Sequence, residues 1–229
     1  MTTVFSTAPV RETTDSGDTP VRILVTGFIS TEIGLNASDI LIRSLMSDLP
    51  SSLSAANHLF HFCLIDANTH NLRFKLQKLL AEVCPSMCVF VGQAPGRNNV
   101  TLESSATNLR FTGPPLSPGG APQSDVILAS GPESYPATLP HMQSIVEKLR
   151  GTGIPAAMSD DAGNSLCNQI LYEGLQYGQQ HAGTPRCGFV HIPALPQQVI
   201  ERWPDYPFMP LDMQRVAMSI ILFALTQDG

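Results

Sequence analysis

Short apolar runs that alternate with longer amphipathic stretches are the feature that most constrains the fold of this chain. The first run, VRILVTGF at residues 21–28, is almost wholly apolar, as is typical of a strand buried on both faces of a parallel sheet. Residues 36–49 follow with apolar side chains at helical spacing, behind Asn36 or Ser38 as the capping residue. A strand followed by a helix is the repeating unit of α/β domains, so the pattern predicts that class.

The alternation continues to the C-terminus. It predicts further strands at residues 59–66, 86–94, 125–131, 154–160 and 187–193, and further helices at residues 68–83, 139–153, 210–227 and from about Cys167 onward. Residues 95–122 show no clear period. For 229 residues we expect one domain, over residues 21–229, rather than two small ones, with a mostly parallel central sheet.

The first 20 residues differ in composition from the rest. They are rich in Thr, Ser, Asp and Pro and have no basic segment followed by an apolar one, so we expect a disordered tail rather than a secretion signal. The five cysteines are an odd number, which favours reduced thiols and a cytoplasmic location over a disulfide framework. Cys84 and Cys88 could suggest a metal clip, but no further ligand pair lies nearby, so we predict no metal and no cofactor.

The charge of the chain narrows its possible partners. Its net charge is -6, with 13 Lys and Arg against 19 Asp and Glu, and it has no basic run. Binding to nucleic acid or to an anionic membrane surface needs positive charge, so we predict neither. No apolar run approaches the ~20 residues of a membrane span.

Cys167 is the candidate nucleophile. It follows the glycine bend of SDDAGNSLCN and falls in the first turn of a predicted helix. Unpaired backbone N–H groups and the positive end of the helix dipole favour a thiolate there, and the thiolate is the reactive form. The alternative is a small buried side chain that only packs, since free cysteines are often buried.

His191 and Glu103 are the candidate partners of Cys167. His191 lies at the end of a predicted strand, and a histidine can take a thiol proton near neutral pH and return it to a leaving amine. A carboxylate would orient the imidazole, and Glu103, in an otherwise uncharged stretch, is our choice over Asp160 and Asp161. Each also has a structural reading: the histidine as a packed side chain, Glu103 as a solvated carboxylate, and the aspartates as helix-capping acids. Carboxyl ends of parallel strands meet at one edge, which would bring these loops together.

Five motifs extend this reading. They are ILVTGF, GQAPGR followed by the glutamate of LESSATN, YPATLP, DAGNSLCN and GFVHIPALPQQ, in that order along the chain. With them, residues 21–229 resemble the pyroglutamyl peptidase I family, also called pyrrolidone-carboxylate peptidases. The resemblance implies a single α/β/α sandwich and a cysteine peptidase that removes N-terminal pyroglutamyl residues from peptides through a thioester.

The resemblance also assigns roles to residues. Cys167 would be the nucleophile, His191 the general base and acid, and Glu103 the orienting carboxylate. Phe28, the backbone near Gln93, and Leu166 match positions that bind the lactam ring. The family needs no metal and often forms homodimers or homotetramers.

The sequence departs from the family pattern at several points. The segment GFISTEIGLN lacks the second phenylalanine that usually follows Gly-Phe, Ser104 follows Glu103 where Arg or Lys is usual, and Arg110 is the nearest match to an arginine of the oxyanion region. Two alternatives therefore stay open: a related cysteine amidohydrolase with another acyl specificity, or a binding protein without catalysis.

Overall fold

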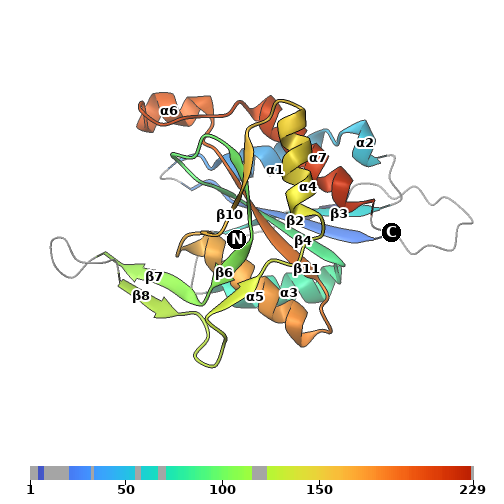
Figure 1. The fold of residues 1–229 in the computed structure, drawn as a ribbon, viewed down its shortest axis with the longest axis vertical. Helices are drawn as coiled ribbons and strands as arrows, with labels where there is room; N and C mark the ends of the chain where they lie inside the picture. Colours follow the sequence, from blue (N-terminus) through green and yellow to red (C-terminus); the bar gives the residue numbers. More distant parts are fainter. Residues whose placement is uncertain are drawn as a thin grey trace, which may run out of the picture.

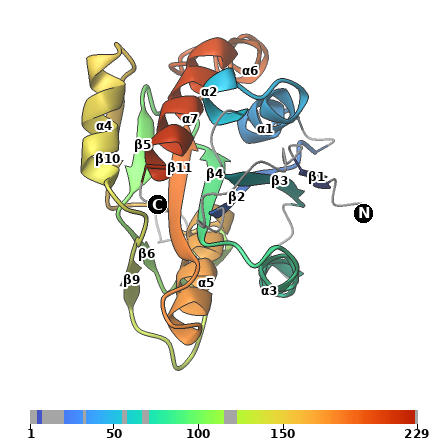
Figure 2. The same ribbon diagram turned by 90° about the vertical axis from the view of Figure 1, so that its right-hand side faces the viewer.

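The computed structural model describes residues 5–7, 21–31, 34–54, 58–66, 71–114 and 123–227. A seven-stranded sheet lies at its centre with helices on both sides (Figures 1 and 2). Its strands lie in the order β1 (Phe5–Thr7), β3 (Leu59–Ile65), β2 (Arg22–Phe28), β4 (Met87–Gln93), β11 (Arg186–Ile192), β5 (Val100–Glu103) and β10 (Ala156–Ser159).

The central strands are parallel and the edge strands reverse direction. β3, β2, β4 and β11 all run one way, whereas β5 pairs antiparallel with β11 and parallel with β10. β1 pairs antiparallel with β3. Four of the six neighbouring pairs are thus parallel, which confirms the expected mostly parallel sheet.

The helices form two layers, as Figure 2 shows. One face of the sheet carries α1 (Ala37–Ser47), α2 (Ser51–Ser54), α4 (Met142–Gly151), α6 (Pro196–Arg202) and α7 (Leu211–Leu225), and the other carries α3 (Leu72–Val83) and α5 (Leu166–Gln180). Two clusters of buried apolar side chains match these two layers. The α/β/α sandwich implied by the resemblance is therefore confirmed. Within the described ranges, no helix has both the length and the hydropathy to span a lipid bilayer.

The link from β2 to α1 shows how the sequence builds the edge of the sheet. Asn36 caps α1, because its side-chain oxygen accepts a hydrogen bond of 2.9 Å from the Ser38 N–H. The Ser38 hydroxyl in turn accepts the Phe28 N–H at 3.0 Å. Gly27 permits this approach, since a Cβ there would lie 2.8 Å from the Ser38 carbonyl oxygen. The carboxyl end of β2 is therefore held against the start of α1.

Some predicted boundaries are wrong. Residues 95–122, where no element was expected, hold β5, β6 (Ser105–Thr107) and β7 (Leu109–Gly113). The strand predicted at residues 125–131 is β8 (Gln123–Val126), which pairs with β7 in a separate two-stranded ribbon, while β6 pairs with β9 (Ser134–Pro136). These strands are only three to five residues long, too short for a periodic pattern to reveal them.

The expected disordered tail falls mostly on residues that the structure does not describe. Its residues Phe5–Thr7 form β1 at the edge of the sheet, opposite His61–Cys63 of β3. The other residues of 1–20 lie outside the described ranges.

Candidate active site

His191 and Glu103 form a buried hydrogen-bonded pair. His191 is the sixth residue of β11, and its Nδ1 lies 2.8 Å from Oε1 of Glu103. Glu103 is the last residue of β5 and is fully buried, so it is not the solvated loop carboxylate that its polar sequence context allowed. An ionised carboxylate can only accept, so Nδ1 carries the proton of this bond, and in the neutral imidazole Nε2 is then the acceptor.

The carboxylate of Glu103 is held in its charged form. Its Oε1 also accepts from Thr101 Oγ1 at 2.9 Å and from Arg97 Nη1 at 2.6 Å. Burial alone would raise the pKa of Glu103, but the hydrogen bonds from His191 and Ser159, the interaction with His191 and the charge of Arg97 together hold it below its ordinary value. The pair therefore keeps a negative charge beside the imidazole.

Cys167 lies on the same face of the sheet as His191. It is the second residue of α5, and a Cβ built on Gly92 of β4 would lie 2.9 Å from its Sγ and 2.6 Å from Cζ of Phe189. Gly92 is the register partner of His191 in the neighbouring strand. The rings of Phe189 and His191 are in contact, tilted by 51° with centroids 4.6 Å apart. Residues two apart on a strand share one face, and Phe189 belongs to the apolar cluster between the sheet and α5, so both side chains project toward α5. The sulfur thus lies against β4 and the imidazole on the neighbouring strand β11, on the same face at the carboxyl end of the sheet.

The state of the thiol differs from the expectation. Burial, followed by the negative charge of Glu103, raises the pKa of Cys167 to about 12, although the N–H of Cys167 itself and Arg97 pull it down. The start of the helix alone does not favour a thiolate here, because the half-buried side chain loses more solvation than the local N–H group restores. The resting thiol therefore keeps its proton.

Three further residues that sequence reasoning missed support the site. Arg97 and Thr101 bond Glu103, and Arg97 Nη2 also donates to the Asp161 carbonyl oxygen at 2.7 Å. Asn168 follows the cysteine and joins α5 to β6 and β7 by bonds to Thr107 N–H, Thr107 O and Leu109 O at 2.7 to 2.8 Å. The only sequence signals were the place of Arg97 in GQAPGR and that of Asn168 in DAGNSLCN, and Thr101 lies in neither motif.

The rival carboxylates, Asp160 and Asp161, lie at the surface. The Asp161 side chain accepts the Gly163 N–H at 2.8 Å, and Asp160 and Asp161 are both exposed. Arg110, the nearest match to the oxyanion-region arginine, pairs with Asp125 on the β7–β8 ribbon at 3.5 Å.

The three residues matched to the lactam site differ in their surroundings. Phe28 and Leu166 belong to the same apolar cluster as Cys167, between the sheet and α5. The Gln93 side chain has a structural task instead, because its Oε1 accepts from the Ala37 N–H at 2.6 Å and from Gln198 Nε2 at 2.8 Å. The oxygen of the Gln93 side chain is therefore already engaged within the protein.

On the α1 side of the sheet, the described residues line at least two cavities. A cavity of about 330 Å³ lies at the carboxyl ends of β2 and β4 and is lined by Gln93, Ile29, Asn36 and Trp203 among others. Strand order reverses between β2 and β4, which is where open α/β sheets bind ligands.

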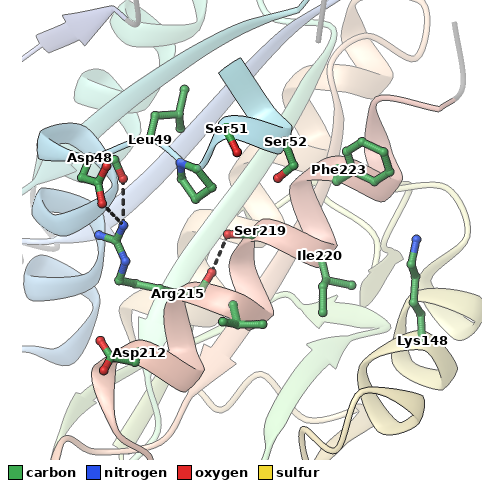
Figure 3. Close-up of a pocket in the computed structure, with 12 residues that line it drawn as sticks. Asp48, Leu49, Ser51, Ser52, Lys148, Asp212, Arg215, Ser219, Ile220 and Phe223 are labelled. Carbon is green, nitrogen blue, oxygen red and sulfur yellow. Dashed lines mark hydrogen bonds and ion pairs between the residues drawn. The ribbon is translucent and has the colours of Figure 1, made fainter. Parts of the chain in front are cut away.

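The larger cavity, of about 830 Å³, lies between α1–α2, α4 and α7 (Figure 3). Figure 3 shows Arg215 of α7 turned toward Asp48, which it bonds at 2.9 Å, with Lys148 on the far wall. The cavity is lined by none of the candidate site residues Cys167, His191 and Glu103, and α5, which carries Cys167, covers the opposite face of the sheet. Size alone therefore does not mark the active site.

A thiol, an imidazole and a carboxylate gathered on one face of an α/β/α sandwich are the parts of a cysteine hydrolase. Among the described residues, no three His, Cys, Asp or Glu side chains are grouped so that they could hold a metal ion. Residues 21–228 match the family model described as pyroglutamyl peptidase, and the chain belongs to this family.

Individual relatives agree. Pyrrolidone-carboxylate peptidase 1 of Photorhabdus laumondii is 36% identical over 152 residues, covering 64% of this chain and 68% of that protein. The pyrrolidone-carboxylate peptidase of Thermosipho africanus is 31% identical over 208 residues, covering 87% and 95%.

Solved structures show the same fold. Pyroglutamyl peptidase I of Bacillus amyloliquefaciens superposes with a TM-score of 0.78 at 27% identity, covering 90% of this chain and 97% of that one. A mutant pyrrolidone carboxyl peptidase of Pyrococcus furiosus gives 0.78 at 26% identity, covering 91% and 99%. The family resemblance, the fold class and the enzyme class, a cysteine peptidase that releases N-terminal pyroglutamate, are confirmed.

Proposed function

We propose that this protein cleaves the bond after an N-terminal pyroglutamyl residue with Cys167 as nucleophile, His191 as base and acid, and Glu103 as orienting carboxylate. The observation that carries the assignment is the 2.8 Å bond between His191 Nδ1 and Glu103 Oε1, because it leaves Nε2 as the acceptor. The Cys167 sulfur lies against Gly92, next to His191 in the sheet.

Because the resting thiol is protonated, proton transfer and attack are coupled. His191 Nε2 takes the proton from Sγ as the sulfur bonds to the pyroglutamyl carbonyl carbon, and Glu103 stabilises the imidazolium that forms. The carbonyl oxygen becomes an oxyanion, for which the backbone N–H groups of the first turn of α5 are suitable donors. His191 then gives the proton to the leaving amine as the C–N bond breaks. Water, deprotonated by the same imidazole, cleaves the thioester and restores the thiol.

The substrate fits an uncharged pocket. Pyroglutamate is a neutral lactam without a free α-amine, so recognition depends on apolar contact and on a few backbone groups that bond its N–H and C=O. Phe28 and Leu166 supply apolar surface from the same cluster that Cys167 packs against, and the backbone at Gln93 supplies polar groups at the end of β4. This pocket lacks the second phenylalanine usual in the family, so the two remaining apolar side chains would dominate ring contact.

One assay tests the function. Release of a reporter amine from pyroglutamyl, prolyl and acetyl-alanyl amides is compared for the wild type and Cys167→Ser. We expect turnover of the pyroglutamyl amide alone, and none above background for Cys167→Ser with the same melting temperature. Turnover of only the other amides would indicate the amidohydrolase alternative. No turnover of any amide would indicate a binding protein.

We also infer a cytoplasmic homodimer or homotetramer that acts on peptides with N-terminal pyroglutamate. Support comes from five unpaired cysteines and from the exposed apolar side chains of Leu109, Phe111 and Val126 on the β7–β8 ribbon. Light scattering coupled to size-exclusion chromatography tests the assembly, since a 24.7 kDa species would contradict it. Cell fractionation tests the location.

A further inference from the structure

Arg97 reaches two separate parts of the site from one side chain. It follows Gly96 in the turn after β4, where Gly96 has a φ of +92°. Its Nη1 bonds both Glu103 Oε1 and Thr101 Oγ1, and its Nη2 bonds the Asp161 carbonyl oxygen at 2.7 Å. Asp161 lies in the segment between β10 and α5, the helix that carries Cys167. One guanidinium thus joins the carboxylate to the segment that leads into the nucleophile.

We propose that Arg97 is a positioning residue of this enzyme, which keeps Glu103 ionised and holds the segment before α5 in place beside it. The proposal rests on the proposed function, because it assumes that Glu103 orients His191. Arg97 acts through Glu103 and through the backbone of Asp161, and it is not assigned any contact with the substrate.

The first half of the role is electrostatic. A buried carboxyl group takes up a proton unless donors and positive charge offset its desolvation. The groups that face Glu103 are His191 from β11, Ser159 from β10, Cys167 from α5, Thr101 from its own strand, and Arg97. Of these, only the guanidinium carries positive charge at every accessible pH. A protonated Glu103 could donate to Nδ1 instead of accepting from it, and Nε2 would then hold the proton that must be absent for catalysis.

The second half of the role is geometric. The planar guanidinium donates in two directions at fixed angles, which a lysine ammonium cannot reproduce with the same rigidity. Arg97 is suited to this because its side chain is mostly buried, with 27% exposed, beside a Glu103 side chain with none. The sequence offers two other candidates for this role, and neither fits. Ser104 is uncharged, and Arg110 pairs with Asp125 on the β7–β8 ribbon.

The charge and the geometry can be separated by two variants. Arg97→Gln removes both, whereas Arg97→Lys keeps the positive charge but cannot bond Glu103 and the Asp161 carbonyl oxygen through two separate nitrogens. Lys78→Gln is the matched control, because it removes one positive charge from an exposed pair with Glu82 on α3. For each variant, kcat and KM for the pyroglutamyl reporter amide are measured against pH, together with the pH dependence of Cys167 alkylation by iodoacetamide and the melting temperature.

For Arg97→Gln we expect kcat to fall about tenfold or more with KM little changed, as for loss of transition-state positioning. We also expect the acid limb of kcat/KM to move up by about 0.5 to 1 pH unit, because the carboxylate–imidazole pair then binds a proton more readily. Alkylation of Cys167 should need higher pH, since Arg97 lowers the pKa of that thiol. Arg97→Lys should keep the acid limb and the alkylation profile of the wild type while kcat still falls. Lys78→Gln should match the wild type throughout.

Several results would overturn the proposal. If Arg97→Gln has the pH profile and kcat of the wild type, Arg97 has no electrostatic role. If Arg97→Lys has the full kcat of the wild type, Arg97 has no geometric role. A loss of kcat that follows only the melting temperature, with no movement of the acid limb or of the alkylation profile, would show a merely structural residue. If Arg97→Gln does not fold, the kcat of Arg97→Lys tests the proposal: a lower kcat than that of the wild type supports it, and an unchanged kcat contradicts it. A wild type that cleaves no pyroglutamyl amide refutes the proposed function instead, and the alkylation profiles still test the Arg97 charge.

Discussion

Replacement of Gly92 by alanine tests the site geometry most directly. A Cβ at this position would lie 2.6 Å from Cζ of Phe189 and 2.9 Å from Sγ of Cys167, well inside the ~3.5–4.0 Å of ordinary carbon contact. Phe189 is fully buried in the core and has little freedom to move, whereas Cys167 is only half-buried at the start of its helix. We therefore expect the sulfur to move away from β4.

Such a shift has two separable consequences. Overpacking of this kind lowers the free energy of unfolding by about 1–3 kcal/mol. A misplacement of about 1 Å at a reacting atom lowers the rate about 100-fold. Gly92→Ala should therefore lose about two orders of magnitude in kcat/KM for the pyroglutamyl reporter amide while it stays folded at 25 °C. Urea unfolding and steady-state kinetics measure the two quantities on the same preparation.

A matched control separates the sulfur from general strain. Gly188 lies on β11, and a Cβ there would collide with the Leu139 side chain, which packs in the cluster on the other side of the sheet. Gly188→Ala should therefore lose similar stability but keep kcat/KM within about threefold of the wild type, since distant sites act independently. If Gly92→Ala keeps wild-type activity per folded molecule, the sulfur does not rest on β4 and the site as described is wrong.

Three further predictions concern the charge and support of the site. Because the pKa of Cys167 is raised to about 12, its iodoacetamide alkylation rate should rise about tenfold per pH unit from pH 7 to 10, and a plateau by pH 8, seen by mass spectrometry, would contradict this. Glu103→Gln should lower kcat/KM at least tenfold, but by less than His191→Ala does. It should also move the alkylation curve of Cys167 to lower pH, because the negative charge that raises the pKa of Cys167 is removed. An unmoved curve would show that Glu103 does not act on the Cys167 thiol. Asn168→Ala, which removes three backbone bonds of a buried amide, should lower the free energy of unfolding by about 2–3 kcal/mol in urea, and a change below about 0.5 kcal/mol would show that the bonds add nothing.

The strands that the sequence revealed are those buried on both faces. β2, β4 and β11 lie between two helical layers, so nearly every residue is apolar and the run is visible without any tertiary information. The start of α5 was also visible, because a glycine bend precedes an amphipathic run. In both cases the residues of the element itself are enough to predict its type and position.

The carboxylate environment depends on contacts that the local sequence does not encode. His191 and Glu103 are 88 positions apart in the sequence. The strand that carries Glu103, β5, has only four residues, and the residues just before it are polar. Its direction, antiparallel to β11, follows from pairing with β10 and β11 and has no signature in its own residues. The thiol illustrates the same limit, since the start of a helix is readable from sequence but the burial that raises the pKa of Cys167 is not.

The antiparallel pairing of β5 also explains why the site can form at all. It places Glu103 opposite Phe189 and Thr101 opposite His191, and residues two apart on a strand share one face. Both β5 side chains therefore project toward α5, where the Cys167 sulfur lies. A slip of one residue in this register would turn Glu103 to the α1 side of the sheet and leave the imidazole without its carboxylate. The proposed mechanism thus depends most on β5, a short strand that the sequence pattern did not predict.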